Sequence, residues 1–176
     1  MLERYKNFLK EFDKKLERYF FAHREYIKCR AGCTGCCELG GYPFSRLEAE
    51  YIMSAFVRLP VGVQGKIKNN IGGLVRDNTE DYRCPFLIDG LCAAYEYRGI
   101  VCRTFGLAYL DKGTVRLPEC AREGLNYSSL FNPETNEIQL QNPVKEILRT
   151  DLILRSPLAQ RFKLEPGEIR PLIKWF

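Results

Sequence analysis

Four cysteines lie within nine residues, in the stretch Cys29-Arg-Ala-Gly-Cys-Thr-Gly-Cys-Cys37, and this stretch limits the choice of fold more than any other. Small, turn-forming residues separate the thiols. A packed apolar core has no need of four sulfurs in a glycine-rich loop, whereas a soft metal ion is bound by thiolates. We therefore expect the rest of the chain to supply further ligands and to build a shell around this loop.

Four more cysteines follow, at Cys84, Cys92, Cys102 and Cys120. The N-terminus is charged and amphipathic and does not have the pattern of a signal peptide, which predicts a cytoplasmic protein with reduced thiols. In that compartment a cysteine cluster indicates metal binding or redox chemistry more than disulfides. No apolar run approaches the length of a membrane span, so no membrane association is expected.

The length of 176 residues predicts a single domain with a genuine hydrophobic core. We divide it into an N-terminal helical region over residues 1–28, a cysteine-cluster region over residues 29–125 and a helical C-terminal segment over residues 126–176. The net charge is +5, but the basic residues are scattered and form no run of five. Nucleic-acid binding is therefore not expected.

Residues 2–27 have the apolar spacing of one long amphipathic helix. Leu2, Tyr5, Leu9, Phe12, Leu16, Tyr19 and Tyr26 follow alternating steps of three and four, with His23 at the missing step. We interpret this stripe as the face that packs on the helix's own domain. The alternative is a surface for a protein partner or a homodimer. His23, the only histidine, is a weaker candidate ligand than the cysteines and is interpreted as a packing or surface residue.

The other patterns predict an α+β fold that is mainly α, with helices and short β-hairpins around the cysteine-rich centre. A capping box, Ser45 to Glu48, predicts a helix to about residue 58. Further helices are expected over residues 61–75 and 143–154. The turns Asp89-Gly90 and Asp111-Lys-Gly113 indicate hairpins, the first of which brings Cys84 and Cys92 together.

The spacing of the thiols leaves the number of metal centres open. Zinc sites commonly use two Cys-x-x-Cys pairs, but only Cys33 and Cys36 form one here. The later cysteines are isolated, which is closer to a cluster or to two interwoven sites. Because adjacent side chains tend to diverge, we expect Cys36 and Cys37 to face different centres, or opposite sides of one. Eight thiols match two four-coordinate sites by number, and one site with additional redox thiols is the alternative.

Other chemistries have less support. The pair Cys33 and Cys36 could be a thioredoxin-type dithiol, but no βαβ pattern surrounds it. The spacing from Cys29 to Cys36 also resembles the signature of radical S-adenosylmethionine enzymes, although the chain lacks the strand-helix alternation of their barrel. Acid–base hydrolysis is not expected, since there is one histidine and no paired-carboxylate motif. Arg103, which follows Cys102, is a candidate cofactor-binding residue because a cation offsets the charge of bound thiolates.

The three cysteine blocks together resemble a known family. They are Cys29 to Cys37, then Cys84-Pro-Phe-Leu to Cys102-Arg103, then Cys120-Ala-Arg-Glu-Gly-Leu125. In this order they resemble the zinc- or iron-chelating domain with the CxxCxxCC motif, the YkgJ-like cysteine-cluster proteins. Two positions depart from the pattern. Three residues rather than two separate the first pair of cysteines, and Gly99 stands where the family usually has proline.

The resemblance implies a metal-binding protein and leaves its reaction open. It implies eight metal ligands: Cys29, Cys33, Cys36, Cys37, Cys84, Cys92, Cys102 and Cys120. We expect an iron–sulfur cluster, 4Fe–4S in preference to other types, serving electron transfer or a redox or protein-modification reaction. A related cysteine cluster occurs in flagellin lysine methylases, which is the basis for protein modification. The alternative is a structural zinc module that binds a protein partner and has no catalytic activity.

Overall fold

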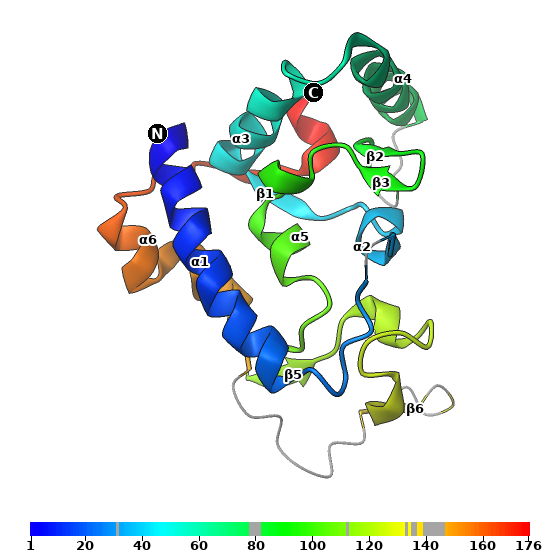
Figure 1. Ribbon diagram of the computed structural model, residues 1–176, viewed down its shortest axis with the longest axis vertical. Coiled ribbons are helices and arrows are strands. Elements are labelled where there is room, and N and C mark those ends of the chain that lie inside the picture. Colours follow the sequence, from blue (N-terminus) through cyan, green and yellow to red (C-terminus); the bar gives the residue numbers. More distant parts are fainter. Residues whose placement is uncertain (31, 78–81, 112, 133, 135–136, 139–146) are drawn as a thin grey trace. The chain divides into compact units, whose positions relative to one another are not determined.

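The computed structural model describes residues 1–30, 32–77, 82–111, 113–132, 134, 137–138 and 147–176. Helices predominate and the strands pair in short antiparallel sheets, as expected for a mainly α member of the α+β class (Figure 1). The chain forms two compact units. The first contains Met1–Leu2, Gly32–Arg103 and Glu165–Phe176, and the second contains Glu3–Ala31 and Thr104–Leu164. The single domain expected over residues 1–176 stays a prediction.

The core of the first unit forms where two helices meet the C-terminal segment. Helices α3 (Arg46–Phe56) and α4 (Val61–Asp77) end within two residues of the ends that the sequence predicted. Strand β1 (Pro43–Ser45) pairs antiparallel with β8 (Ile169–Pro171), and η5 (Leu172–Trp175) follows. The apolar tail therefore packs back on its own unit. The buried cluster comprises Phe44, Ile52, Ala55, Phe56, Ile67, Phe86, Ala94 and Leu172.

The capping box at the start of α3 is confirmed and has a second role. Ser45 accepts a hydrogen bond from the Glu48 backbone, and the Glu48 side chain accepts from the Ser45 backbone. The other carboxylate oxygen of Glu48 accepts the backbone N–H of Ile100 at 2.7 Å. Ile100 begins α5 (Ile100–Thr104), the helix that carries Cys102. A carboxylate only 4% exposed thus joins the first turn of α3 to the first turn of α5.

The hairpin predicted at Asp89-Gly90 is also confirmed. Strands β2 (Leu87–Ile88) and β3 (Leu91–Cys92) pair antiparallel, with Leu87 opposite Cys92. Both turn residues have positive φ, +49° for Asp89 and +78° for Gly90, as a two-residue turn that follows the twist of the strands requires. A helical turn, η1 (Tyr95–Tyr97), follows the hairpin. Cys92 is therefore fixed at the open end of a tight turn.

The second unit is built on the N-terminal helix α1 (Leu2–Ala22). Its predicted core-facing stripe is buried at Tyr5, Phe8, Leu9, Phe12 and Leu16, and Phe8 meets the ring of Phe162 edge-on at 6.3 Å. The helix was expected to reach residue 27, and this extent is wrong. Residues 23–26 form a turn instead, because the Tyr26 carbonyl accepts the backbone N–H of Tyr127. A tertiary hydrogen bond overrides the helical pattern there.

The remaining elements of the second unit are short. The predicted second hairpin is present as β4 (Tyr109–Asp111) and β5 (Thr114–Arg116). After η2 (Glu119–Ala121) and η3 (Ser128–Leu130), strand β6 (Phe131–Asn132) pairs with β7 (Glu137–Ile138). The last two elements are η4 (Thr150–Arg155) and α6 (Pro157–Arg161), and the Ser156 side chain caps α6.

The helix predicted over residues 143–154 is only partly tested. Residues 143–146 lie outside the described part of the chain. Residues 147–149 are not helical, since the Leu148 carbonyl accepts the backbone N–H of Leu110 at 2.9 Å beside β4. A continuous helix is therefore wrong, and a 3-10 helix begins only at Thr150. Within the described ranges, no helix is long and apolar enough to cross a membrane.

Candidate metal centre

The second half of the cysteine loop folds into one helical turn in the first unit. Helix α2 (Gly35–Glu38) carries Cys36 and Cys37, and the backbone N–H of Cys37 donates to the Thr34 carbonyl at 2.7 Å. Cys33 precedes this turn and is exposed, whereas Cys37 is buried. The loop therefore presents its last two thiols to the protein interior and its second thiol to solvent.

The second cysteine block lies directly beside the loop. The backbone N–H of Cys84 donates to the Cys37 carbonyl at 2.7 Å, and that of Gly40 donates to the Tyr82 carbonyl at 2.7 Å. These two bonds join the loop to the segment that precedes the β2–β3 hairpin. Gly40 is required at this approach, because a Cβ there would overlap the Tyr82 carbonyl oxygen and lie 2.8 Å from the Cys84 nitrogen.

The sulfurs of Cys36 and Cys37 lie 3.9 Å apart. The expectation that these neighbours diverge is therefore wrong. They turn to the same side because both face the second cysteine block. The thiol of Cys37 contacts that of Cys36, and the thiols of Cys84 and Cys92 lie near enough to shift the pKa of Cys37 and to be shifted by Cys36. The two blocks thus bring four sulfurs together around Cys37.

The charge states of these thiols follow from one shared proton. The hydrogen bond from Cys37 and, to a smaller extent, the positive charge of Arg98 lower the pKa of Cys36 and of Cys92 to about 7. The same donor lowers the pKa of Cys84. Cys37 keeps its proton, since its hydrogen bonds to Cys36, Cys84 and Cys92, together with burial, raise its pKa.

One thiol proton cannot satisfy three sulfurs. Cys37 has a single S–H and donates it to one neighbour at a time. The other two sulfurs keep their own protons, or ionise beside one another at a cost that rises with each further charge. A soft cation would replace the proton and satisfy all four sulfurs at once.

Cys102 is the fifth thiol of this group. It lies on α5, whose first turn Glu48 holds. Burial raises the pKa of Cys102 well above the usual range, and the nearby charges of Cys84, Cys36 and Cys92 act in the same direction. Cys102 is therefore a neutral thiol as long as no cation is bound beside it.

The two candidate arginines have different surroundings. Arg98 acts electrostatically on Cys36, Cys92 and Cys102, while its guanidinium lies 3.5 Å from the centre of the Tyr95 ring. The guanidinium of Arg103 donates to the carbonyls of Arg98 and Glu96, at 2.9 Å and 2.7 Å. Arg103 thus braces the turn that carries Arg98, and its role in binding a cofactor stays a prediction. The sequence signal favoured Arg103 because it directly follows a cysteine.

The remaining two cysteines belong to the second unit. Cys29 is exposed, and its sulfur accepts a hydrogen bond from the Asn126 side chain at 3.1 Å. Cys120 is buried in η2. The expectation that all eight sulfurs form one arrangement stays a prediction. Five of them, Cys36, Cys37, Cys84, Cys92 and Cys102, come together within the first unit.

His23 has a structural role in the second unit, as the sequence interpretation favoured. It is only 1% exposed, and its Nδ1 lies 2.5 Å from the Tyr127 hydroxyl. Burial raises the pKa of Tyr127 to about 12, so the hydroxyl keeps its proton. The same oxygen accepts the backbone N–H of Ala108 at 3.1 Å. The pair fixes the turn that leads to Cys29.

The donor set can be compared with what a metal requires. All eight cysteines are described, and none forms a disulfide. In the described part of the chain, no group of three or more histidine, cysteine, aspartate or glutamate side chains is arranged so that it could hold a metal ion. Two thiolates on a tetrahedral zinc with bonds of about 2.3 Å would lie about 3.8 Å apart. The 3.9 Å separation in the Cys36–Cys37 pair suits such a shared metal.

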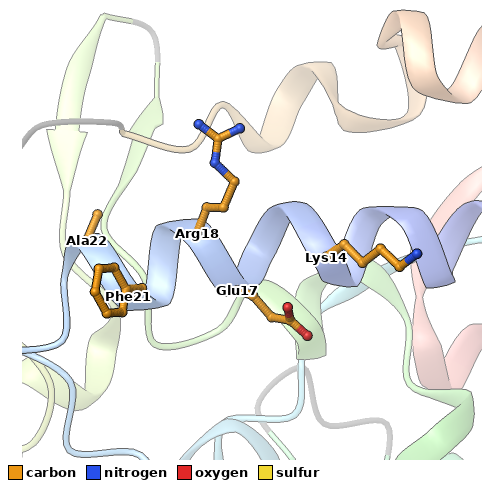
Figure 2. A pocket seen from close by; sticks show the side chains of 5 residues that line it. All are labelled: Lys14, Glu17, Arg18, Phe21 and Ala22. Atoms are coloured by element: carbon orange, nitrogen blue, oxygen red, sulfur yellow. The ribbon is translucent and has the colours of Figure 1, made fainter.

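A shallow recess lies along the second half of α1 (Figure 2). It is lined by Lys14, Glu17, Arg18, Phe21 and Ala22. Phe21 is 69% exposed, and the guanidinium of Arg24 lies 4.6 Å from the centre of its ring. None of these residues can bind a soft metal through sulfur, so the recess does not belong to the candidate metal centre.

Comparison with models of known protein families, with curated proteins and with solved structures finds no match.

The unequal pKa values predict unequal thiol reactivity in the metal-free, reduced protein. Cys36 and Cys92 should be alkylated first by iodoacetamide, because their pKa values lie at about 7. Their rates should rise about 10-fold from pH 6 to pH 8, as the thiolate fraction rises. Cys37 and Cys102 should stay slow at pH 8 because they keep their protons. Peptide mass spectrometry after short labelling measures each rate.

The control for this labelling is the protein unfolded in urea, where all four thiols should react at one rate. Equal rates at Cys36, Cys37, Cys92 and Cys102 in the folded protein would show that the sulfurs do not share a proton as described.

Proposed function

We propose that this protein holds a metal centre on its cysteines, an iron–sulfur cluster in preference to zinc, and that it serves electron transfer or a redox or protein-modification reaction. The observation that carries the proposal is the approach of the two cysteine blocks, in which the Cys36 and Cys37 sulfurs lie 3.9 Å apart and the backbone N–H of Cys84 donates to the Cys37 carbonyl at 2.7 Å. Thiolates are the ligands of iron–sulfur clusters and of structural zinc alike. A bound cluster would supply one-electron transfer.

The surroundings of the thiols support a site that adjusts the charge and the reduction potential of a bound metal. The charge of Arg98 acts on Cys36 and Cys92 and offsets the negative charge of bound thiolates. The backbone at Phe86 and at Ala94 lowers the pKa of Cys84 and of Cys92, respectively, and so favours their thiolates. Such hydrogen bonds to ligand sulfurs set the reduction potential of a cluster. The resemblance to the cysteine-cluster family supports the same proposal.

A structural zinc module that binds a protein partner is the second candidate. The 3.9 Å separation of the Cys36 and Cys37 sulfurs favours it, because it is close to that of two ligands on a single tetrahedral ion. In this case we place the partner on the exposed side of α1, near its end at Phe21. The metal would then contribute folding energy only.

Anaerobic purification followed by metal and acid-labile sulfide analysis decides between the two candidates. An iron–sulfur protein should be brown, should contain iron and sulfide in comparable amounts, and should lose its visible absorbance in air. Stoichiometric zinc in a colourless protein would favour the structural module. A folded protein that retains no metal under these conditions would contradict both candidates.

A further inference from the structure

Two cysteines from distant segments of the first unit are joined through their backbones. The N–H of Cys84 donates to the carbonyl of Cys37 at 2.7 Å, and the N–H of Gly40 donates to the carbonyl of Tyr82 at the same distance. All four residues belong to the first unit. Because the two bonds run in opposite directions between the segments, they fix Cys37 and Cys84 as neighbours.

The spacing of this pair meets the requirement of a disulfide. A backbone hydrogen bond between adjacent segments places the α-carbons of the two residues about 5 Å apart, and a disulfide joins α-carbons about 4.4 to 6.8 Å apart. The two thiols also lie near each other, since the Cys37 thiol is the main cause of the lowered pKa of Cys84. Both cysteines are free thiols in this structure.

The other close pairs are less suited to a disulfide. The sulfurs of Cys36 and Cys37 lie 3.9 Å apart, but the α-carbons of adjacent residues are separated by about 3.8 Å, less than an unstrained disulfide requires. Both residues also belong to the helical turn α2, which such a bond would distort. In the hairpin, Cys92 lies opposite Leu87 and not opposite Cys84. Cys37 and Cys84 are therefore the pair that can close with the least backbone movement.

Access and loop length also favour a bond between Cys37 and Cys84. Cys37 is buried, whereas Cys84 is half-buried, so a small reagent reaches Cys84 first. The bond would close a stretch of chain that contains both α3 and α4. A cross-link across a loop of this length restricts the unfolded chain more than the folded one and so stabilises the fold.

We propose that Cys37 and Cys84 are a reversible redox dithiol, which a small aliphatic disulfide oxidises to a Cys37–Cys84 bond that locks α2 to the segment before the β2–β3 hairpin. This inference goes beyond the proposed function and needs no bound metal. The reduced pair leaves the two segments held by hydrogen bonds alone, and the oxidised pair joins them covalently.

The oxidation proceeds by thiol–disulfide exchange. The Cys84 thiolate attacks one sulfur of the oxidant, the S–S bond of the oxidant breaks, and one aliphatic thiol leaves with a proton. The Cys37 sulfur then attacks the Cys84 sulfur of the mixed disulfide, loses its proton and releases the second aliphatic thiol. The pair loses two electrons and two protons, which the oxidant gains as it becomes two thiols. Bonds that form first at other cysteines rearrange by the same exchange.

Equilibrium oxidation followed by peptide mapping tests the inference without a variant. The reduced, chelator-treated protein is equilibrated with 2-hydroxyethyl disulfide and 2-mercaptoethanol, remaining thiols are blocked with iodoacetamide, and trypsin is added without reduction. Trypsin separates Cys37, on the peptide of residues 31–46, from Cys84, on the peptide of residues 84–98. We expect these two peptides to be cross-linked, and fragmentation should place the bond at Cys37 and Cys84.

The control for this oxidation is the same treatment in urea, where the fold no longer brings the pair together. Short loops close at a lower entropic cost than long ones, so bonds within one peptide should predominate there. In the folded protein, a predominance of bonds within one peptide, or a cross-link through Cys36 or Cys92, would overturn the inference. Equal yields of the Cys37–Cys84 bond with and without urea would overturn it as well.

The second test compares Cys84→Ser with Cys92→Ser, a matched control because Cys92 is also half-buried and lies on the same peptide. Cys84→Ser should abolish the cross-link, whereas Cys92→Ser should keep it. Oxidised wild type should unfold at a higher urea concentration than the reduced protein, and a thiol reductant should reverse this shift. Cys92→Ser should show the same shift and Cys84→Ser none. A wild-type midpoint that oxidation lowers or leaves unchanged would overturn the inference.

Discussion

Replacing Gly40 by alanine is expected to separate the two cysteine blocks. The added Cβ would overlap the Tyr82 carbonyl oxygen and press against the Cys84 nitrogen, both of which are backbone atoms that cannot rotate away. The variant should lose the two hydrogen bonds between the blocks and be less stable by about 3 kcal/mol, from overpacking and lost hydrogen bonds together. Urea unfolding of the metal-free protein, followed by circular dichroism, measures this loss.

The matched control for Gly40→Ala is Gly72→Ala in the same unit. Gly72 is an exposed residue of α4, and a Cβ there would meet no atom within 4 Å. Alanine should stabilise this helix by up to about 1 kcal/mol. If Gly40→Ala were as stable as the wild type, the close approach of the two blocks would be contradicted.

Replacing Cys37 by serine is expected to have the largest effect on metal binding among the cysteines. Its thiol is buried beside that of Cys36, and among the described sulfurs it is the one whose proton lowers the pKa of Cys36, Cys84 and Cys92. Loss of an outer hydrogen bond typically weakens metal affinity by about 10-fold to 100-fold, so loss of a central ligand should exceed that range. Competition with a chelator of known affinity measures the change.

Cys33→Ser is the informative comparison for Cys37→Ser. Both are cysteines of the same loop, but Cys33 is exposed, whereas Cys37 is buried among other sulfurs. We expect Cys33→Ser to keep the greater part of the metal affinity. Equal losses in the two variants would mean that the grouping around Cys37 does not decide binding.

Much of the first unit could be predicted because its signals are local. The capping box from Ser45 to Glu48 and the turn at Asp89-Gly90 use hydrogen bonds and backbone angles set by neighbouring residues. These features correctly placed α3 and the hairpin that carries Cys92. The apolar stripe of α1 likewise predicted which face is buried.

What the sequence did not predict depends on contacts between distant segments. The end of α1 at Ala22 depends on the bond from Tyr127 to Tyr26, and residues 147–149 leave the helical pattern to bind beside β4. The convergence of Cys36 and Cys37 depends on the second cysteine block. This block begins at Cys84, 47 residues after Cys37 in the sequence.

The sequence did not predict the polar partners of the cysteines either, because these partners come from distant segments of the chain. Asn126 is 97 residues from Cys29 and carries no motif. Arg98 lies within a few residues of Cys92 and Cys102 in the sequence, but this position did not distinguish it from Arg103. A glycine at position 106 that leaves room for an amide and a sulfur has no local pattern, because the side chain it accommodates comes from another segment.

X-ray absorption at the edge of the metal that is purified with the protein tests the central claim most directly. The thiol grouping around Cys37 predicts a first shell made of sulfur, at about 2.3 Å if the metal is zinc, and this shell should be lost or depleted in Cys37→Ser. A first shell of oxygen and nitrogen only, or a sulfur shell unchanged by Cys37→Ser, would contradict the account.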